Sequence, residues 1–150
     1  MPTTPQSLHV DLAKAVERIV YIGDTPPSRV FRTYINEQQL HDLTLPYVAV
    51  VLGQRSMRMH DRQTMLHRCE IVVQIVAQLA ENTAERVDEL LGVMEGNLER
   101  FQTVQLPGIN AQVLHETITM PMAYNEQRLR EIGVFDSMIR ATWQIQTPRP

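Results

Sequence analysis

Two adjacent elements are predicted from residues 68–101, which read RCEIVVQIVAQLAENTAERVDELLGVMEGNLERF. In the first part, apolar residues alternate from Cys69 to Ala77, as in a strand that has one face in a protein core. From Val87 onward, apolar residues recur at intervals of three and four, which is the spacing of an amphipathic helix. Asn82 and Glu85 have the spacing of a capping box at the helix start. A strand followed by a helix is therefore expected to form the core unit.

The segments on both sides of this unit predict further helices and strands, and together they define the fold class. Helical and strand segments follow one another in the order helix, strands, helix, strands. This order predicts an α+β fold with a mixed, mainly antiparallel sheet, long strands and two main helices packed on one face. The further predicted elements are a helix over residues 7–22, strands over residues 30–35, 47–52, 113–120 and 135–147, and a helical turn over residues 126–131.

Composition is that of an ordinary single globular domain. The chain has 150 residues, of which 43% are hydrophobic and 21% are charged, and such a chain can bury a full core without disulfides. We expect one domain over residues 1–150, with residues 1–6 as a flexible arm. The net charge of −3 argues against a dedicated nucleic-acid-binding protein. No long apolar run and no signal-peptide pattern is present, so we expect synthesis and retention in the cytoplasm.

Motifs for catalysis or cofactor binding are missing from the sequence. There is no P-loop, no glycine-rich dinucleotide fingerprint and no pair of cysteines for zinc. His60, His67 and Asp61 could imitate a metal site, but this set is more typical of a solvated surface. His115 and Glu116 are adjacent on a predicted strand and so would face opposite sides, which disfavours an acid–base pair. The sequence therefore predicts no catalytic residue, no metal and no cofactor.

Residues 54–67 are expected to form a flexible loop, because they follow Gly53 and show no sustained period. Residues 54–68 carry four arginines against one aspartate, whereas residues 81–100 carry six acids against two arginines. Methionine packs against irregular surfaces and arginine pairs with carboxylates, so the loop suits an adaptable contact arm. A solvated surface loop is the alternative interpretation.

Two glycines of the predicted helix lie away from its apolar stripe. At 100° per residue, Gly92 and Gly96 are about 140° and 180° from the centre of the stripe. A glycine inside an exposed helix costs roughly 1 kcal/mol relative to alanine. Close approach of a partner would explain this cost, and chance variation on a solvated face is the alternative.

The order of these elements resembles that of the tail terminator, or tail completion, proteins of long-tailed bacteriophages. The resemblance covers residues 7–147 and is carried by the strand–helix unit EIVVQIVAQLAENTAERVDELLGVMEGNLER, the segment VLHETITM and the final segment FDSMIRATWQIQT. It implies a subunit of a hexameric ring at the head-proximal end of the virion tail. Such a ring caps the tail tube, stops its polymerisation and presents a surface to the head–tail connector, while DNA passes through.

The residues expected to contact a neighbouring subunit or partner come from the basic segment and the acidic helix. The resemblance brings no catalytic residue. One alternative is another structural protein of the phage neck or tail, such as a connector or a tube-like protein. A second is a small cytosolic ligand-binding domain or enzyme, which would have to use Cys69, His115 and Glu116. The expected contact residues are Arg55, Met57, Arg58, Met59, Arg62, Glu85, Glu89, Gly92 and Gly96.

Overall fold

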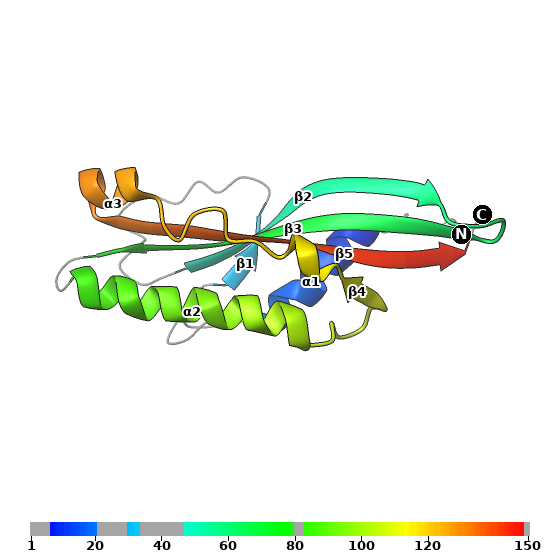
Figure 1. Cartoon of the computed structure of the whole chain (residues 1–150), viewed down its shortest axis with the longest axis horizontal. Helices are drawn as coiled ribbons and strands as arrows, with labels where there is room; N and C mark the ends of the chain where they lie inside the picture. Colours follow the sequence, from blue (N-terminus) through cyan, green and yellow to red (C-terminus); the bar gives the residue numbers. More distant parts are fainter. Residues whose placement is uncertain (1–6, 21–29, 34–46, 80–82, 149–150) are drawn as a thin grey trace, which may run out of the picture.

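The computed structural model describes residues 7–20, 30–33, 47–79 and 83–148 (Figure 1). Within these residues, five strands form one sheet in the order β1-β2-β3-β5-β4. β1 is parallel to β2, and every other neighbouring pair is antiparallel. The predicted mixed, mainly antiparallel α+β fold is therefore confirmed. The strands are β1 (Val30–Arg32), β2 (Tyr47–Met59), β3 (Thr64–Gln78), β4 (Ala111–Val113) and β5 (Val134–Pro148).

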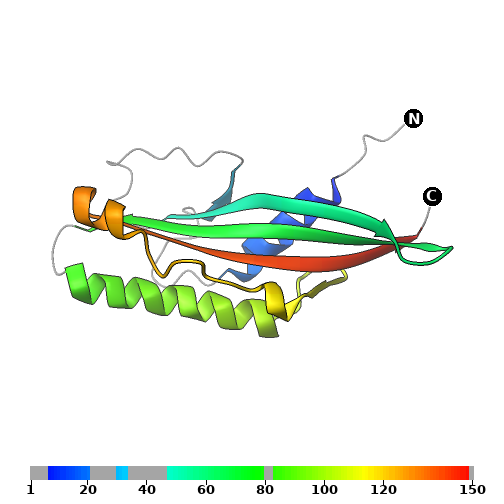
Figure 2. The ribbon, with the colours of Figure 1, turned by 45° about the horizontal axis from the view of Figure 1, so that its top comes forward.

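Two main helices cover one face of the sheet, which we call the helix side. They are α1 (Leu8–Ile19) and α2 (Thr83–Thr103), and both contribute to a single large core with β2, β3 and β5. Figure 2 shows α2 lying along this side of the long strands. The opposite face of the sheet is called the open face below. Among the described residues, no helix combines the length and the apolar character needed to cross a membrane.

α1 begins where the sequence predicts it. The hydroxyl of Ser7 accepts a hydrogen bond from the backbone N–H of Val10 at 3.2 Å, which caps the first turn. Leu12 and Val16, one turn apart, are fully buried against the sheet. The ring of His9 is also buried, and its Nε2 lies 2.7 Å from the backbone oxygen of Glu70 on β3. This contact ties the first turn of α1 to the middle of the sheet.

The apolar stripe of α2 packs on the same core. Val87, Leu90, Met94 and Phe101 are all buried, as the period of three and four predicts. The ring of Phe101 meets that of Trp143 on β5 edge to face, with centroids 5.5 Å apart. The far end of α2 also bonds to α1, because Arg100 Nε donates to the backbone oxygen of Ile19 at 2.6 Å.

A smaller apolar cluster lies on the open face, at the end of the sheet where β1 pairs with β2. Tyr47, Ala49, Val76 and Val134 are buried there, and Phe31 stacks on Tyr47 with centroids 5.5 Å apart. Beyond this cluster the open face becomes polar. The two halves of the open face therefore differ in chemistry.

α3 (Glu126–Ile132) confirms the predicted helical turn and is attached to β5. Asn125 caps its start, and Gly133 ends it in the left-handed conformation, with φ of 64°. Asp136 on β5 accepts hydrogen bonds from Arg128 Nη1 at 2.5 Å and from Gln74 Nε2 at 2.6 Å. This carboxylate therefore joins α3, β5 and β3.

The strand predicted over residues 113–120 is wrong. β4 ends at Val113, and a 3-10 turn follows over His115–Thr117. The hydroxyl of Thr117 accepts from the backbone N–H of Thr142 at 2.9 Å and donates to the backbone oxygen of Leu114 at 2.6 Å. The Thr117 side chain thus makes hydrogen bonds that backbone groups would make in a regular strand ladder. Pairing with β5 returns only at the single bridge between Thr119 and Arg140.

Most of the other predicted elements are confirmed with small changes of length, whereas the strand expected over residues 47–52 extends to Met59. The helix expected over residues 7–22 spans Leu8–Ile19, and the strand expected over residues 135–147 spans Val134–Pro148. β1 confirms the short strand that was expected from Val30. Asn82 and residues 1–6 lie outside the described residues.

Candidate functional site

The loop expected over residues 54–67 is instead the outer half of a β-hairpin. β2 continues to Met59, β3 begins at Thr64, and a tight turn joins them. In the turn, Asp61 Oδ1 accepts the backbone N–H groups of Gln63 and Thr64 at 2.7 and 2.8 Å. These bonds, the one to Gln63 first, hold the pKa of the Asp61 carboxyl below its ordinary value. The loop prediction was wrong because residues 54–59 of β2 are exposed, so burial imposes no alternating pattern on them although they belong to a strand.

A bulge separates the outer hairpin from the inner sheet. Leu52 pairs with Ile71, and the next pair is Arg55 with Cys69. Between these two pairs, β2 has one residue more than β3, which defines a β-bulge. Gly53 lies in the bulge, and a side chain at this position would overlap the carboxylate of Glu70. Glu70 Oε1 also accepts the backbone N–H of Gln54 at 3.3 Å. A larger residue at position 53 would displace the Glu70 carboxylate from its place over the bulge.

The register divides the predicted contact residues between the two faces of the hairpin. Arg55, Met57 and Met59 pair with Cys69, His67 and Met65, so their side chains are on the helix side. Arg58 pairs with Leu66 and lies on the open face, and Arg62 lies in the turn. The structure thus brings Arg55, Met57 and Met59 together and separates Arg58 from them.

Met57 and Met59 form an exposed apolar surface at the hairpin end. Each is 58% exposed, and the neighbouring Met65 is half-buried. In Figures 1 and 2 the hairpin and the end of β5 extend beyond the last turn of α2. A side chain on the helix side of this extension therefore meets no α2 residue. We call Met57, Met59 and Met65 the methionine surface.

His67 links the three long strands at the inner border of the methionine surface. Arg55 Nη2 lies 3.2 Å from His67 Nδ1, and His67 Nε2 lies 2.8 Å from Thr147 Oγ1 on β5. A guanidinium only donates, so Nδ1 accepts and the ring proton is on Nε2. Burial, followed by the nearby charge of Arg55, lowers the pKa of His67 below its ordinary value of 6.5. The imidazole therefore stays neutral in the folded chain at neutral pH.

The lowered pKa of His67 makes the stability of the fold depend on pH. Because the unfolded chain takes up the proton more readily, the free energy of unfolding is highest above about pH 6.5 and falls on acidification below it. Urea denaturation at a series of pH values from neutral to mildly acidic measures this fall. The His67→Gln variant has no ring to titrate, so its profile in this range is expected to be flatter. Parallel profiles for the two proteins would contradict the assignment.

The acidic residues of α2 are at the other end of the molecule. Glu85 and Glu89 are exposed in the first two turns of α2, and Glu89 forms a salt bridge with Arg86 at 2.7 Å. Figure 1 shows the start of α2 and the hairpin tip at opposite ends of the long axis. A single chain therefore does not bring the predicted basic and acidic contact residues together.

The two helix glycines differ in their surroundings. Gly92 is exposed, and a Cβ atom added to it would have no neighbour within 4 Å. Gly96 is half-buried. Gly92 is thus on the exterior of α2, as the stripe predicts.

Gly92→Ala is expected to stabilise the folded chain by up to about 1 kcal/mol, because alanine restricts the unfolded chain and fits an exposed helix. The measurement is the free energy of unfolding from urea denaturation, at a protein concentration too low for association. A loss of stability would show that the exterior of α2 is covered by other parts of the same chain.

The residues considered for catalysis or metal binding are not assembled into a site. Cys69 is buried, and burial raises the pKa of its thiol, which disfavours the reactive thiolate. His60 and Asp61 are exposed in the hairpin turn, and His115 and Glu116 are exposed in the 3-10 turn. In the described part of the chain, no three histidine, cysteine or acidic residues are grouped closely enough to hold a metal ion.

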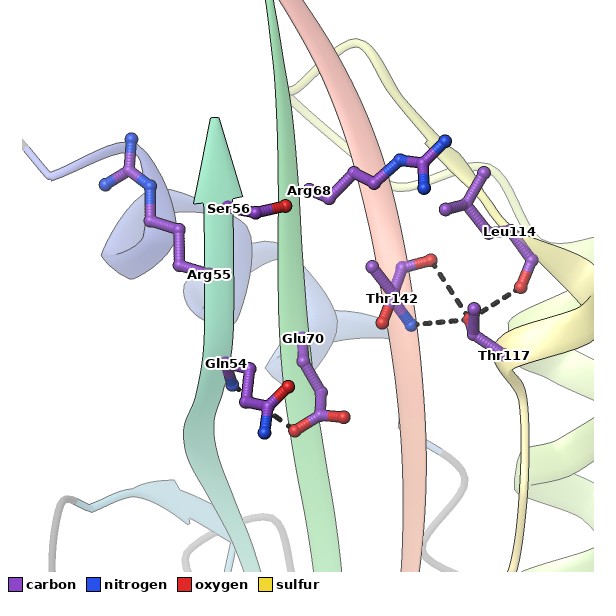
Figure 3. A pocket seen from close by; sticks show the side chains of 8 residues that line it. All are labelled: Gln54, Arg55, Ser56, Arg68, Glu70, Leu114, Thr117 and Thr142. Atoms are coloured by element: carbon purple, nitrogen blue, oxygen red, sulfur yellow. Dashed lines mark hydrogen bonds between the residues drawn. The ribbon is translucent and has the colours of Figure 1, made fainter. Parts of the chain in front are cut away.

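A polar hollow of about 230 Å³ on the open face had no signal in the sequence. It is lined by the outer parts of β2 and β3, by Thr142 on β5 and by the 3-10 turn (Figure 3). Its lining residues come from three separate parts of the chain and meet through strand pairing and through the hydrogen bonds of Thr117. Figure 3 shows Arg68 extending across β5 toward Leu114, whereas Glu70 points toward Gln54.

Comparison of the chain with protein-family models and with curated proteins gave no match.

Proposed function

We propose that this chain is a structural subunit of a long-tailed bacteriophage tail. In this proposal, copies of the chain close into a ring that caps the tail tube, stops its polymerisation and provides the surface for head joining. The resemblance to tail terminator proteins is the source of the function, of the expected six copies and of the head-proximal location in the virion. The projecting hairpin supports the proposal as a surface for assembly.

The observation that carries the proposal is the exposed end of the sheet. On the outer edge of β2, β1 pairs only with Val48, Ala49 and Val50. No described residue pairs with this edge of β2 beyond Val51. An unpaired strand edge next to exposed apolar side chains favours contact with another chain. Met57 and Met59 beside this edge are large and flexible, and they can fill an irregular groove on a neighbour.

The distribution of charge supports contact between unlike ends of two copies. Arg55 and Arg62 are at the hairpin end, whereas Glu85 and Glu89 are at the start of α2. A contact between different patches of identical subunits generates a ring when the rotation closes. Charge pairs at such a contact set the register and the choice of partner more than the affinity. Arginine also suits this role because its guanidinium binds carboxylates in a planar, bidentate manner.

Native mass spectrometry of the purified chain and electron microscopy of the virion test the proposal. We expect a closed ring in solution, and a label on this chain at the junction of head and tail. A strict monomer that is stabilised by a small metabolite would contradict the proposal and favour a ligand-binding domain or an enzyme. A label elsewhere along the neck or tail would instead identify a connector or a tube-like protein.

A further inference from the structure

The polar half of the open face carries arginines from all three long strands. Strand register puts Arg58 of β2, Arg68 of β3 and Arg140 of β5 on this face, through their pairs with Leu66, Ser56 and Val72. All three side chains are exposed, and none forms a salt bridge with a described residue. Neutral hydrogen-bonding side chains share this face: Ser56, Thr142, Gln144 and Gln146 by register, and Gln54 at the hollow.

We propose that this arginine face, defined by Arg58, Arg68 and Arg140, binds the phosphate backbone of double-stranded DNA without regard to sequence. Guanidinium groups bind phosphate oxygens in a bidentate manner, and glutamine, serine and threonine side chains also donate to these oxygens. A broad sheet surface spreads these donors over three strands. Contacts to phosphate position a protein on DNA but carry no sequence information, so binding through this face is expected to be independent of sequence.

Glu70, the acidic residue on this face, does not neutralise the charge of the three arginines. Glu70 Oε1 is held by the backbone N–H of Gln54 and lies over the bulge at Gly53. In Figure 3 the Arg68 side chain extends the other way, across β5. The guanidinium thus remains available to an anion outside the subunit. On the helix side, in contrast, α2 exposes Glu85, Asp88, Glu89, Glu95 and Glu99.

This separation of charge selects the face that DNA meets. The whole chain has a net charge of −3, so attraction of DNA must come from a local surface. Phosphates are repelled from the exposed acids of α2 and attracted to the arginines on the other side of the sheet. The competing occupant is the acidic α2 surface of a second copy. The inference does not depend on the proposed ring, because the arginine face is complete within one subunit.

Fluorescence anisotropy with a labelled DNA duplex tests the inference at low salt. The variant Arg58→Gln/Arg68→Gln/Arg140→Gln is expected to bind the duplex at least about tenfold more weakly, because each substitution removes a contact to phosphate. Each lost contact also reduces the slope of log K against the logarithm of the salt concentration by about 0.9. The matched control is Arg18→Gln/Arg86→Gln/Arg130→Gln. It changes the net charge by the same amount as the first variant but removes one arginine from each of the three helices. The control is expected to keep most of the affinity.

Equal weakening of both variants, or no binding by the wild-type chain at low salt, would overturn the inference. If the variant Arg58→Gln/Arg68→Gln/Arg140→Gln binds DNA normally but no longer self-associates, the inference is also overturned. The arginines would then bind the α2 acids of a neighbouring copy. A measurement on the wild type avoids any effect of substitution on folding. Bound DNA is expected to protect Arg58, Arg68 and Arg140 from phenylglyoxal while Arg86 and Arg130 react, and uniform protection or none would contradict the proposal.

Discussion

Val73→Asp is expected to prevent the chain from folding. Val73 is fully buried in the middle of β3, between Val50 on β2 and Ile139 on β5, and it faces the core under the helices. An unpaired carboxylate there costs several kcal/mol even when it is neutralised by protonation. Domains of this size are stable by only about 5–15 kcal/mol. We expect insoluble protein or, in any soluble fraction, loss of the cooperative thermal transition in circular dichroism.

Val72→Asp is the matched control, because it adds the same carboxylate one position away. Val72 is half-buried on the open face, directly opposite Arg140. A cross-strand ion pair there contributes roughly 0.2–1 kcal/mol and offsets part of the lost apolar burial. This variant is expected to fold and to melt close to the wild type. If both variants fold equally well, the helix side of β3 is not the core.

The accuracy of the sequence predictions follows the position of the core. Cys69, Ile71, Val73 and Ala77 alternate because one face of β3 is buried under the helices, and the same is true of β5. A strand with one buried face has apolar residues at every second position, and this alternation can be recognised in the sequence. The sheet class, β5 and the inner part of β3 were therefore predictable from local sequence.

The hairpin was missed for the same physical reason. At Met57, Arg58 and Met59 neither face is covered by the helices, so burial imposes no pattern on the sequence. What holds these residues in a strand is pairing with Leu66 and its neighbours on β3. Side-chain packing against a partner strand decides such cases more than the propensity of the residue.

The candidate surfaces were predictable only in part. The sequence identified Arg55, Met57 and Met59 as contact residues but grouped Arg58 with them, because a loop has no alternating faces. In a strand, Arg55 and Arg58 are three positions apart and point to opposite sides. Arg68 and Arg140 become neighbours of Arg58 only through strand register, which the sequence alone does not provide.

Met57→Ser/Met59→Ser is expected to leave the subunit folded and to abolish self-association. Both side chains are exposed in the subunit, so their loss removes little core packing. If both are buried in a groove of the neighbouring copy, each contributes about 1.5–3 kcal/mol to the contact. Two such losses weaken one contact by roughly a hundredfold or more. Closure of a ring repeats that contact at every subunit, so the loss is multiplied.

Sedimentation velocity on the double variant and on two controls measures this effect. Met57→Leu/Met59→Leu keeps the apolar area and is expected to assemble. Arg58→Gln changes the same strand on its open face, and it is expected to assemble while binding DNA more weakly. Thermal melting of each variant at a concentration where only single subunits exist shows whether the fold is intact. Full assembly of the serine variant would show that the methionine surface is solvated, and the contact between copies would then have to lie elsewhere on the sheet.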